Sequence, residues 1–193
     1  MKRRMLLSVV LGILFLTEFA HGRGLDQAAL PDPAEYGDSG FGMDVSVYGW
    51  LNFGYHLVGG GAGAQFAWPL LPNGFIPSPR FRDAFHIEGG LDFGAWSWAS
   101  ANDDLGLMSF SPFAGVRWAV YVLETLAPFV CVKAGPSFEL WDNDLVDDEL
   151  EVGFYWATSA GVIWDLSSWM SMRVEAGWGR YRDLVRIGVL FRL

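Results

Sequence analysis

The sequence contains one cysteine, few basic residues and, after its first 22 positions, no long apolar run. The single cysteine, Cys131, cannot form an intramolecular disulfide, so other forces must hold the fold together. The 13 Lys and Arg residues are outnumbered by 22 Asp and Glu, which gives a net charge of −9 at pH 7. Because phosphate binding needs a basic face, this balance argues against nucleic acid as a partner. After residue 22 no apolar run approaches the roughly 18 residues that a membrane-spanning helix needs.

The first 22 residues have the pattern of a secretory signal peptide. Three basic residues at positions 2–4 precede an apolar run that ends at Leu16, and the small residues Ala20 and Gly22 follow at the spacing that signal peptidase prefers. We predict export and cleavage after Gly22; an uncleaved anchor helix is the alternative. Cleavage removes three basic residues and one acid, so the net charge changes from −9 to −11.

The rest of the chain is unusually apolar for an exported acidic protein. Hydrophobic residues make up 52% of the sequence, which has 10 Trp and 15 Phe. Without a membrane-spanning helix, only a closed barrel could satisfy every backbone polar group in lipid. Residues 23–40 lack periodicity and are predicted to be a mobile periplasmic leader. Beyond them the chain alternates with period two between turn-like stretches, which predicts eight strands: 41–53, 58–69, 84–98, 108–121, 127–141, 150–164, 169–179 and 184–193.

Alternation sorts each segment into an apolar face and a polar face. In residues 84–98, for example, Ile87 lies on one face and Glu88 on the other. No charged residue falls on any apolar face, where Ser97 and Thr158 are the polar exceptions. A lipid-facing Arg or Lys at mid-bilayer costs about 2–4 kcal/mol, which would produce this exclusion. We therefore predict that the apolar faces meet lipid and that the charged residues form an interior network: Asp44, His86, Glu88, Asp92, Arg117, Lys133, Glu139, Glu151, Arg173, Glu175, Arg186 and Arg192.

The chain ends in VRIGVLFRL, which is apolar at every second position: Val185, Ile187, Val189, Phe191 and Leu193. With the signal peptide and the amphipathic segments, this ending resembles the small outer-membrane β-barrels of Gram-negative bacteria, the OmpA/OmpX-like group. In that group such a strand is the C-terminal assembly signal, usually ending on Phe. The resemblance implies an all-β, eight-stranded antiparallel up-and-down transmembrane barrel over residues 41–193, with both termini in the periplasm. It also implies outer-membrane lipid and the outer-membrane assembly machinery as partners.

The predicted interior has six acids and five permanent bases. An eight-stranded barrel is just wide enough to be filled by its own side chains. Buried charges are tolerated when they are paired and hydrogen-bonded. We therefore expect a plugged interior; a narrow path for ions or small solutes through the same charges is the alternative.

Two stretches contain residue types that could support chemistry. His86 and Glu88 share a face and could serve a nucleophile at Ser109 or Ser111, but any interior with this many charges contains such a pair. We therefore expect no enzyme activity and no cofactor. The acidic stretch 141–151 could bind a hard cation through oxygen ligands, yet it lacks the glycine and spacing of an EF-hand loop. It is better interpreted as a solvated external loop that could contact an extracellular partner.

Three further patterns bear on the barrel wall. Residues 70–83, LLPNGFIPSPRFRD, are long where a short periplasmic turn is expected; they could form an ordered plug or rim, or hide a hairpin that would give ten strands. The glycine-rich stretch before Trp68 is interpreted as a strand that can curve tightly. Trp68, Trp118 and Trp164 lie near the predicted periplasmic ends and should form part of an aromatic girdle.

The sequence thus predicts an integral outer-membrane barrel with a non-enzymatic structural or surface-interaction role. A narrow channel for ions or small solutes is the first alternative. The second is a soluble periplasmic barrel that binds an apolar ligand, like a lipocalin, in which the apolar faces would turn inward and the charges outward.

Overall fold

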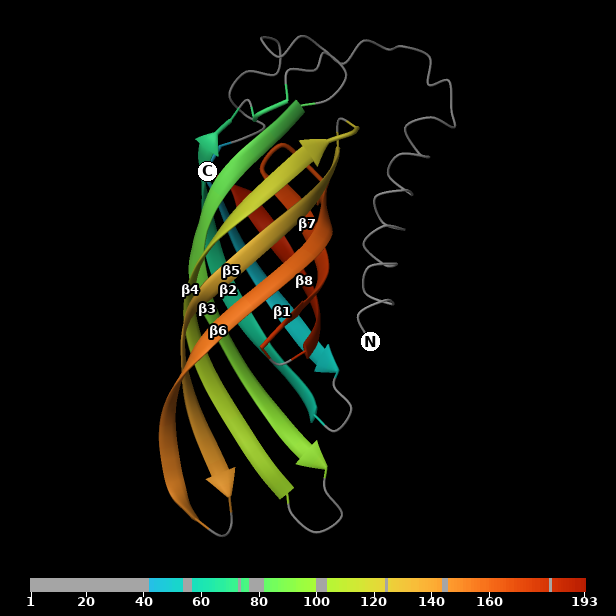
Figure 1. Ribbon diagram of the computed structural model, residues 1–193. Helices are drawn as coiled ribbons and strands as arrows, with labels where there is room; N and C mark the ends of the chain where they lie inside the picture. The colour runs from blue at the N-terminus through green and yellow to red at the C-terminus, as the bar shows by residue number, and fades with distance from the viewer. Residues whose placement is uncertain are drawn as a thin grey trace, which may run out of the picture.

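The structure is a computed structural model, and the residues it describes are 42–53, 57–72, 74–76, 82–99, 104–123, 125–143, 146–180 and 182–193. The predicted signal peptide and leader lie outside them. Within the described ranges no helix is long and apolar enough to cross a membrane. Eight antiparallel strands close into one barrel (Figure 1): β1 (Asp44–Phe53), β2 (Leu57–Leu71), β3 (Arg82–Ala99), β4 (Asp104–Tyr121), β5 (Leu126–Asn143), β6 (Val146–Asp165), β7 (Met170–Gly179) and β8 (Arg182–Arg192).

The eight predicted strands are confirmed, and each observed strand overlaps its predicted segment. Every strand pairs with the next along the chain, and β8 pairs with β1, as expected for an up-and-down barrel. In that closing pair the outward residues Val47 and Gly49 lie opposite Val189 and Ile187. The described part of the 70–83 connection contains no additional strand between β2 and β3.

The predicted division of the faces is also confirmed. On β5 the outward Val132 is 55% exposed, whereas the next residue, Lys133, is 1% exposed. On β8 the outward Ile187 is 57% exposed and its neighbour Arg186 is 3% exposed. Side chains alternate across a strand, so a single parity places the apolar residues outside and the charged residues inside.

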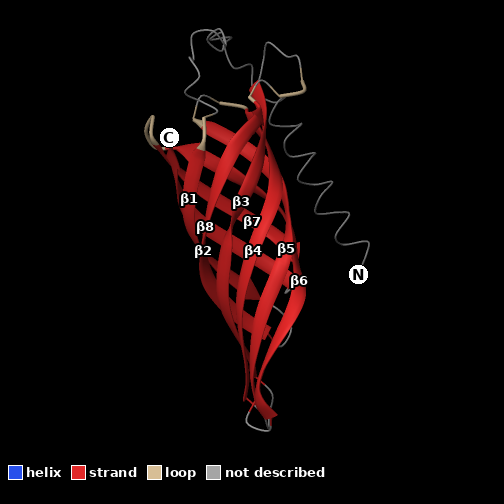
Figure 2. Ribbon diagram, turned by 90° about the vertical axis from the view of Figure 1, so that its left-hand side faces the viewer, coloured by secondary structure: helices blue, strands red, loops and turns tan. Residues whose placement is uncertain are grey.

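The barrel wall is taller on one side. The strands β3 to β6 have 18, 18, 18 and 20 residues, whereas β1 and β7 have 10 each. The extra length projects away from the C-terminus, at what we call the far end of the barrel (Figure 1). Several of the described loops lie at the opposite, C-terminal end (Figure 2). We call the projecting parts of β3 to β6 the far-end wall.

Inward glycines on β2 make room for aromatic rings. A Cβ on Gly61 would lie 1.9 Å from the Phe93 carbonyl oxygen and 2.6 Å from the Trp50 ring. A Cβ on Gly63 would lie 2.6 Å from the Tyr48 ring. These glycines, which the sequence predicts to allow tight curvature, accommodate side chains from the neighbouring strand.

The interior charges lie between two apolar clusters. Toward the far end, Tyr48 belongs to a cluster with Trp50, Trp96, Leu107 and Leu184. Toward the C-terminal end, Phe129 belongs to a cluster with Ala119, Ala127, Cys131, Ile163 and Leu190. Arg186 lies 5.4 Å from the Tyr48 ring centre, and Arg173 lies 4.5 Å from that of Phe129. The charged groups are therefore flanked by apolar side chains on both sides.

Candidate functional site

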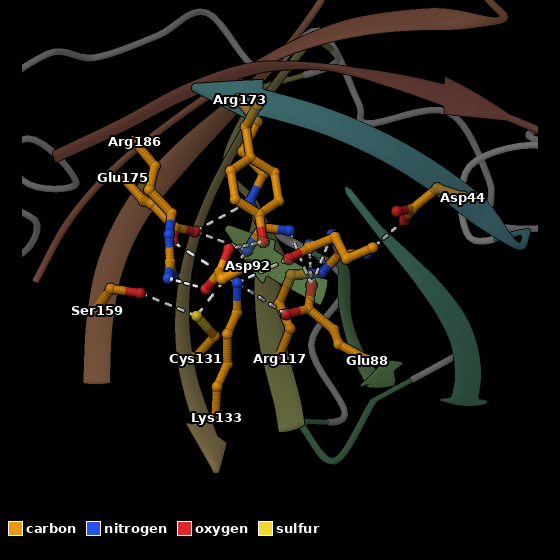
Figure 3. Close-up of polar contacts among 12 residues, drawn as sticks. Asp44, Glu88, Asp92, Arg117, Cys131, Lys133, Ser159, Arg173, Glu175 and Arg186 are labelled. Carbon is orange, nitrogen blue, oxygen red and sulfur yellow. Dashed lines mark hydrogen bonds and ion pairs between the residues drawn. The ribbon is translucent and has the colours of Figure 1, made fainter. Parts of the chain in front are cut away.

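The centre of the interior network is a chain of ion pairs between Glu88, Arg173 and Glu175 (Figure 3). Arg173 donates to Glu88 Oε1 at 2.8 Å and, through Nη2 and Nε, to Glu175 Oε2 at 2.7 and 3.0 Å. Arg173 and Glu175 are two residues apart on β7 and therefore share a face. Glu175 also accepts from Arg186 Nη1 at 2.7 Å, which extends the chain to β8.

Toward the far end the network finishes on Asp92. Arg186 Nη2 lies 2.7 Å from Asp92 Oδ2. The hydroxyl of Tyr48 donates to Asp92 Oδ1 at 2.6 Å, and that of Tyr155 donates to Oδ2 at 2.8 Å. Both tyrosines lie on the inward faces of their strands, so the carboxylate is bound by one cation and two hydroxyls.

At its other end the network finishes on Asp44. Arg117 Nη2 lies 2.5 Å from Asp44 Oδ2, and Arg117 Nη1 lies 3.3 Å from Glu88 Oε1. Because Asp44 is the first residue of β1, this pair links the C-terminal end of the barrel to its centre.

Lys133 is held less tightly than the arginines. Its Nζ donates to Gln65 Oε1 at 2.7 Å but lies 3.7 Å from Glu175 and 3.9 Å from Glu88. Gln65 in turn donates to Glu88 at 3.1 Å. The ammonium also lies 4.9 Å from the Phe113 ring centre.

The connected network is electrically balanced. It contains four acids and four bases, all of them buried: Asp44, Glu88, Asp92 and Glu175, with Arg117, Lys133, Arg173 and Arg186. A buried charge is costly unless it is paired and hydrogen-bonded, so the balance makes this interior tolerable.

The remaining predicted network residues lie apart from this centre. Glu139 is buried and pairs with Arg180 at 3.0 Å, while Arg192 pairs with Asp165 and donates to the Tyr121 hydroxyl at 3.1 Å. His86 is buried on the inward face of β3.

The placement of Glu151 in the interior network was wrong, because its side chain is exposed. Glu151 has the inward parity of β6. However, β6 pairs with β7 only from Ala157 to Asp165, so Glu151 stands on the far-end wall, past the closed part of the barrel.

The residues considered for catalysis are not brought together. His86 lies opposite Arg117 in the β3–β4 ladder, and Ser111 lies opposite Asp92, six positions along β3. That spacing corresponds to about 20 Å. Ser111 instead shares a hydrogen bond of 2.9 Å with Ser137. Among the described residues no cluster of His, Cys, Asp or Glu is arranged to hold a metal ion, and the side chains at 142–149 lie outside that description.

The single cysteine, Cys131, is buried on the inward face of β5. Its Sγ lies 2.9 Å from Ser159 Oγ and 3.9 Å from Arg173 Nη2. Cys131 therefore packs beside the network.

Several residues that bond to the interior charges were not among the predicted network residues. Tyr48, Gln65 and Tyr155 lie on the polar faces but carry no charge, and only charged residues were counted. Arg180 and Asp165 lie one position beyond the predicted strand ends. Counting hydrogen-bonding residues of inward parity would have found the first three.

Little space remains inside the barrel. A cavity of about 30 Å³ at the far-end side is lined by residues that include Asn52 and Arg186. A cavity of about 20 Å³ at the C-terminal end is lined by Asp44, Arg117 and Arg192 among others. One water molecule needs a cavity of roughly 10–15 Å³. The first cavity could therefore hold about two water molecules and the second about one.

Aromatic rings gather at two levels of the outer surface. Near the C-terminal end, Trp68 and Trp164 are exposed, and Trp118 is half-buried. Toward the far end the rings of Phe93 and Phe110 lie 4.9 Å apart, and Phe138 continues the row at 6.1 Å from Phe110. Apart from Thr158, the outward side chains between these levels are apolar, which is the arrangement expected of girdles flanking a lipid-exposed band.

No family model matches the chain, and no curated protein matches it. The barrel is similar to a crystal structure of Ail, the attachment invasion locus protein of Yersinia pestis, in complex with the heparin analogue sucrose octasulfate. That comparison has a TM-score of 0.51 at 13% identity and covers 78% of this chain and 97% of that chain. A second Ail crystal structure gives a TM-score of 0.50 at 12% identity, covering 79% and 99%. The chain therefore has the fold of the small eight-stranded outer-membrane barrels, as the resemblance to the OmpA/OmpX-like group implied.

Proposed function

We propose that the protein is an integral outer-membrane barrel with a closed interior, and that its far-end wall binds an extracellular partner. The outer surface supports membrane insertion, because Val132 and Ile187 at mid-strand are more than half exposed. On β6, eight positions separate Trp164 from Trp156. At about 3.3 Å per residue and a tilt of about 40°, this spacing spans roughly 20 Å, close to the ~25 Å apolar band of such barrels.

The interior argues against a lipocalin-like role. A pocket for an apolar ligand needs hundreds of Å³ lined mainly by apolar groups. This barrel instead holds four acids and four bases in contact with one another, and the cavities that border them at Arg186 and at Arg117 are of about 30 and 20 Å³. The same filling supports a structural scaffold with limited or no conductance.

The observation that supports surface interaction is the far-end wall. β6 has 20 residues, whereas a membrane-spanning strand needs about 9–11. Its outward side chains Leu150 and Val152 are 65% and 70% exposed. They lie farther along β6 than Trp156, on the side away from the C-terminus. Apolar groups exposed beyond the lipid band are typical of a protein-binding surface.

The edge of this wall favours an extended partner. The ladder between β6 and β7 covers only Ala157 to Asp165 of β6. Just beyond it, the backbone N–H of Arg180 donates to the Trp156 carbonyl and its Nη1 donates to the Phe154 carbonyl. From Val146 to Gly153, β6 therefore has a neighbour only on its β5 side among the strands described. This unpaired edge has Leu150 and Val152 among its outward side chains and four acids at positions 147–151, so it suits the addition of one more strand from a basic partner. Because the strands of such barrels tilt by about 35–45°, the β6 edges of two copies in one membrane would cross and could not pair along their length. The edge therefore suits a segment of another molecule.

Panning of a displayed random-peptide library on the protein in lipid nanodiscs tests this role. We expect enrichment of extended peptides in which apolar residues alternate with basic ones. Binding should fall at least tenfold in the variant Leu150→Lys/Val152→Lys, because charged side chains on an edge oppose strand addition. The matched control is Ser168→Lys, an exposed position at the opposite end. Failure to enrich such peptides, or equal binding to both variants, would count against the proposal.

A narrow channel is the second candidate. It is favoured by the two water-sized cavities, which border the network at Arg186 and at Arg117, and by the longer contacts of Lys133 between them. Single-channel recording separates the two candidates.

A further inference from the structure

One carboxylate lies on the outer side of the barrel. Asp83, near the start of β3, has the parity of the outward residues Phe85 and Ile87. It lies at the level of the C-terminal aromatic rings, opposite Val120 of β4. A charged side chain at this position would normally face the lipid boundary, yet Asp83 is only 1% exposed. Something must therefore cover it.

The cover is the described part of the connection between β2 and β3. The backbone N–H groups of Phe75 and Ile76 donate to Asp83 at 2.9 and 3.3 Å. From the other side the indole N–H of Trp118 donates at 2.8 Å. Three donors on one carboxylate are enough to satisfy a charge withdrawn from water. We call residues 74–76 and Asp83 the rim clasp.

Gly74 allows the clasp to close. Its φ is +61°, a conformation that favours glycine, and its N–H donates to the Leu71 carbonyl at 3.1 Å. A Cβ at this position would lie 2.1 Å from the Asp83 carboxylate carbon. Both the backbone conformation and the close approach therefore require glycine. The turn is fixed against the outer wall and does not enter the barrel.

The clasp covers the Asp83 carboxylate and exposes apolar side chains in its place. The Phe75 ring lies 5.4 Å from the outward ring of Phe85 and is 58% exposed, and Ile76 is also exposed. Exposed Trp68 and Leu70 lie at the same end of the barrel. The clasp thus continues the apolar girdle over a position where the strand itself carries an acid.

We propose that the rim clasp is a lipid-binding surface, which seats Phe75 and Ile76 in the interfacial region of the nearer leaflet, at the C-terminal end of the barrel. Its occupant is phospholipid, because the exposed apolar side chains adjoin the girdle and Asp83, the charged residue of the clasp, is covered. Aromatic and apolar side chains at this depth anchor a protein at the boundary of the hydrocarbon. This inference goes beyond the proposed function but rests on the proposed membrane location.

Site-directed spin labelling of the full chain in phospholipid vesicles tests the clasp. With Cys131→Ser as background, a nitroxide is placed by Phe75→Cys, by Leu70→Cys as the girdle reference, and by Ser168→Cys as the aqueous reference. Collisions with oxygen and with a water-soluble nickel chelate report the depth of each label. We expect the label at 75 to resemble that at 70, with the ratio of oxygen to nickel collisions several-fold higher than at 168.

The same label tests the role of the carboxylate. In Asp83→Ala, which removes the acceptor of both backbone N–H groups, the label at 75 should move toward the aqueous value while the label at 70 does not change. Heat-dependent gel mobility confirms that each variant is folded. A water-exposed label at 75 in the folded parent, as for a loop that docks a periplasmic protein, would overturn the proposal. So would a depth that Asp83→Ala leaves unchanged. A label at 70 in water would instead refute the membrane location.

Discussion

Glu175→Gln tests whether the interior is held by balanced charge. Gln has nearly the shape of Glu, so the change removes the charge with little change in volume. Glu175 is 1% exposed and accepts from Arg173 at 2.7 Å and from Arg186 at 2.7 Å, with Lys133 at 3.7 Å. The variant leaves four cations facing three acids. Removing one partner of a buried pair costs about 3–5 kcal/mol, and we expect a loss of that size in the free energy of unfolding.

Equilibrium unfolding by urea in lipid vesicles, followed by tryptophan fluorescence, measures this loss. The matched control is Glu151→Gln, the same chemical change at an exposed position, which should alter stability by less than about 0.5 kcal/mol. Adding Lys133→Met to Glu175→Gln restores the balance at three acids and three cations, so the double variant should recover part of the loss. Equal stability of Glu175→Gln and Glu151→Gln would refute the account of the network.

Two further predictions concern the wall. Val132→Arg should make insertion less favourable by about 2–4 kcal/mol, because the side chain faces lipid at mid-strand, whereas Val152→Arg on the far-end wall should cost about 0–1 kcal/mol. Refolding yield into vesicles compares the two variants. Equal costs would mean that the far-end wall is not outside the lipid. Gly61→Ala should largely abolish folding, because its Cβ would overlap the Phe93 carbonyl and the Trp50 ring. The control Gly49→Ala, whose Cβ would lie 3.8 Å from the nearest atom, should fold like the parent. A Gly61→Ala barrel that is folded by heat-dependent gel mobility would show that the interior can repack.

Period-two patterning was sufficient to predict the eight strands and their two faces because it acts locally and repeats in every strand. Because one face of each strand meets lipid and the other carries charges, only one parity fits each segment. Because consecutive strands are antiparallel and joined by short connections, only one order of strands fits the sheet. The closing pair of β1 and β8 was implied by the resemblance to the small outer-membrane barrels. These features need no knowledge of distant contacts.

Features that depend on height along the barrel could not be predicted from parity. Glu151 has the inward parity but stands beyond the closed part of the wall, and parity does not reveal where neighbouring strands end. The partners Arg180 and Asp165 lie just outside the predicted strands, so they were not assigned to a face. A contact between two strands far apart in sequence, such as Arg186 with Asp92, requires the register of the whole barrel.

The connection 70–83 shows a different limit. Its prolines and glycine indicated a turn, and its length suggested a plug or rim. The fold of the turn depends on Asp83 accepting two backbone N–H groups and the Trp118 indole. Nothing in the local sequence indicates that an acid at the start of a strand will be covered by the residues before it.

Single-channel recording in planar bilayers is the most direct test of the central claim, which is a barrel closed by a balanced network of buried charges. The protein is refolded in detergent, its folding is confirmed by heat-dependent gel mobility, and the folded fraction is added to the bilayer. We expect insertion without unitary current steps, because the cavity beside Arg186 and the cavity beside Arg117 are each only water-sized and are separated by paired side chains. Reproducible steps from the folded wild-type protein would contradict the account and favour the channel.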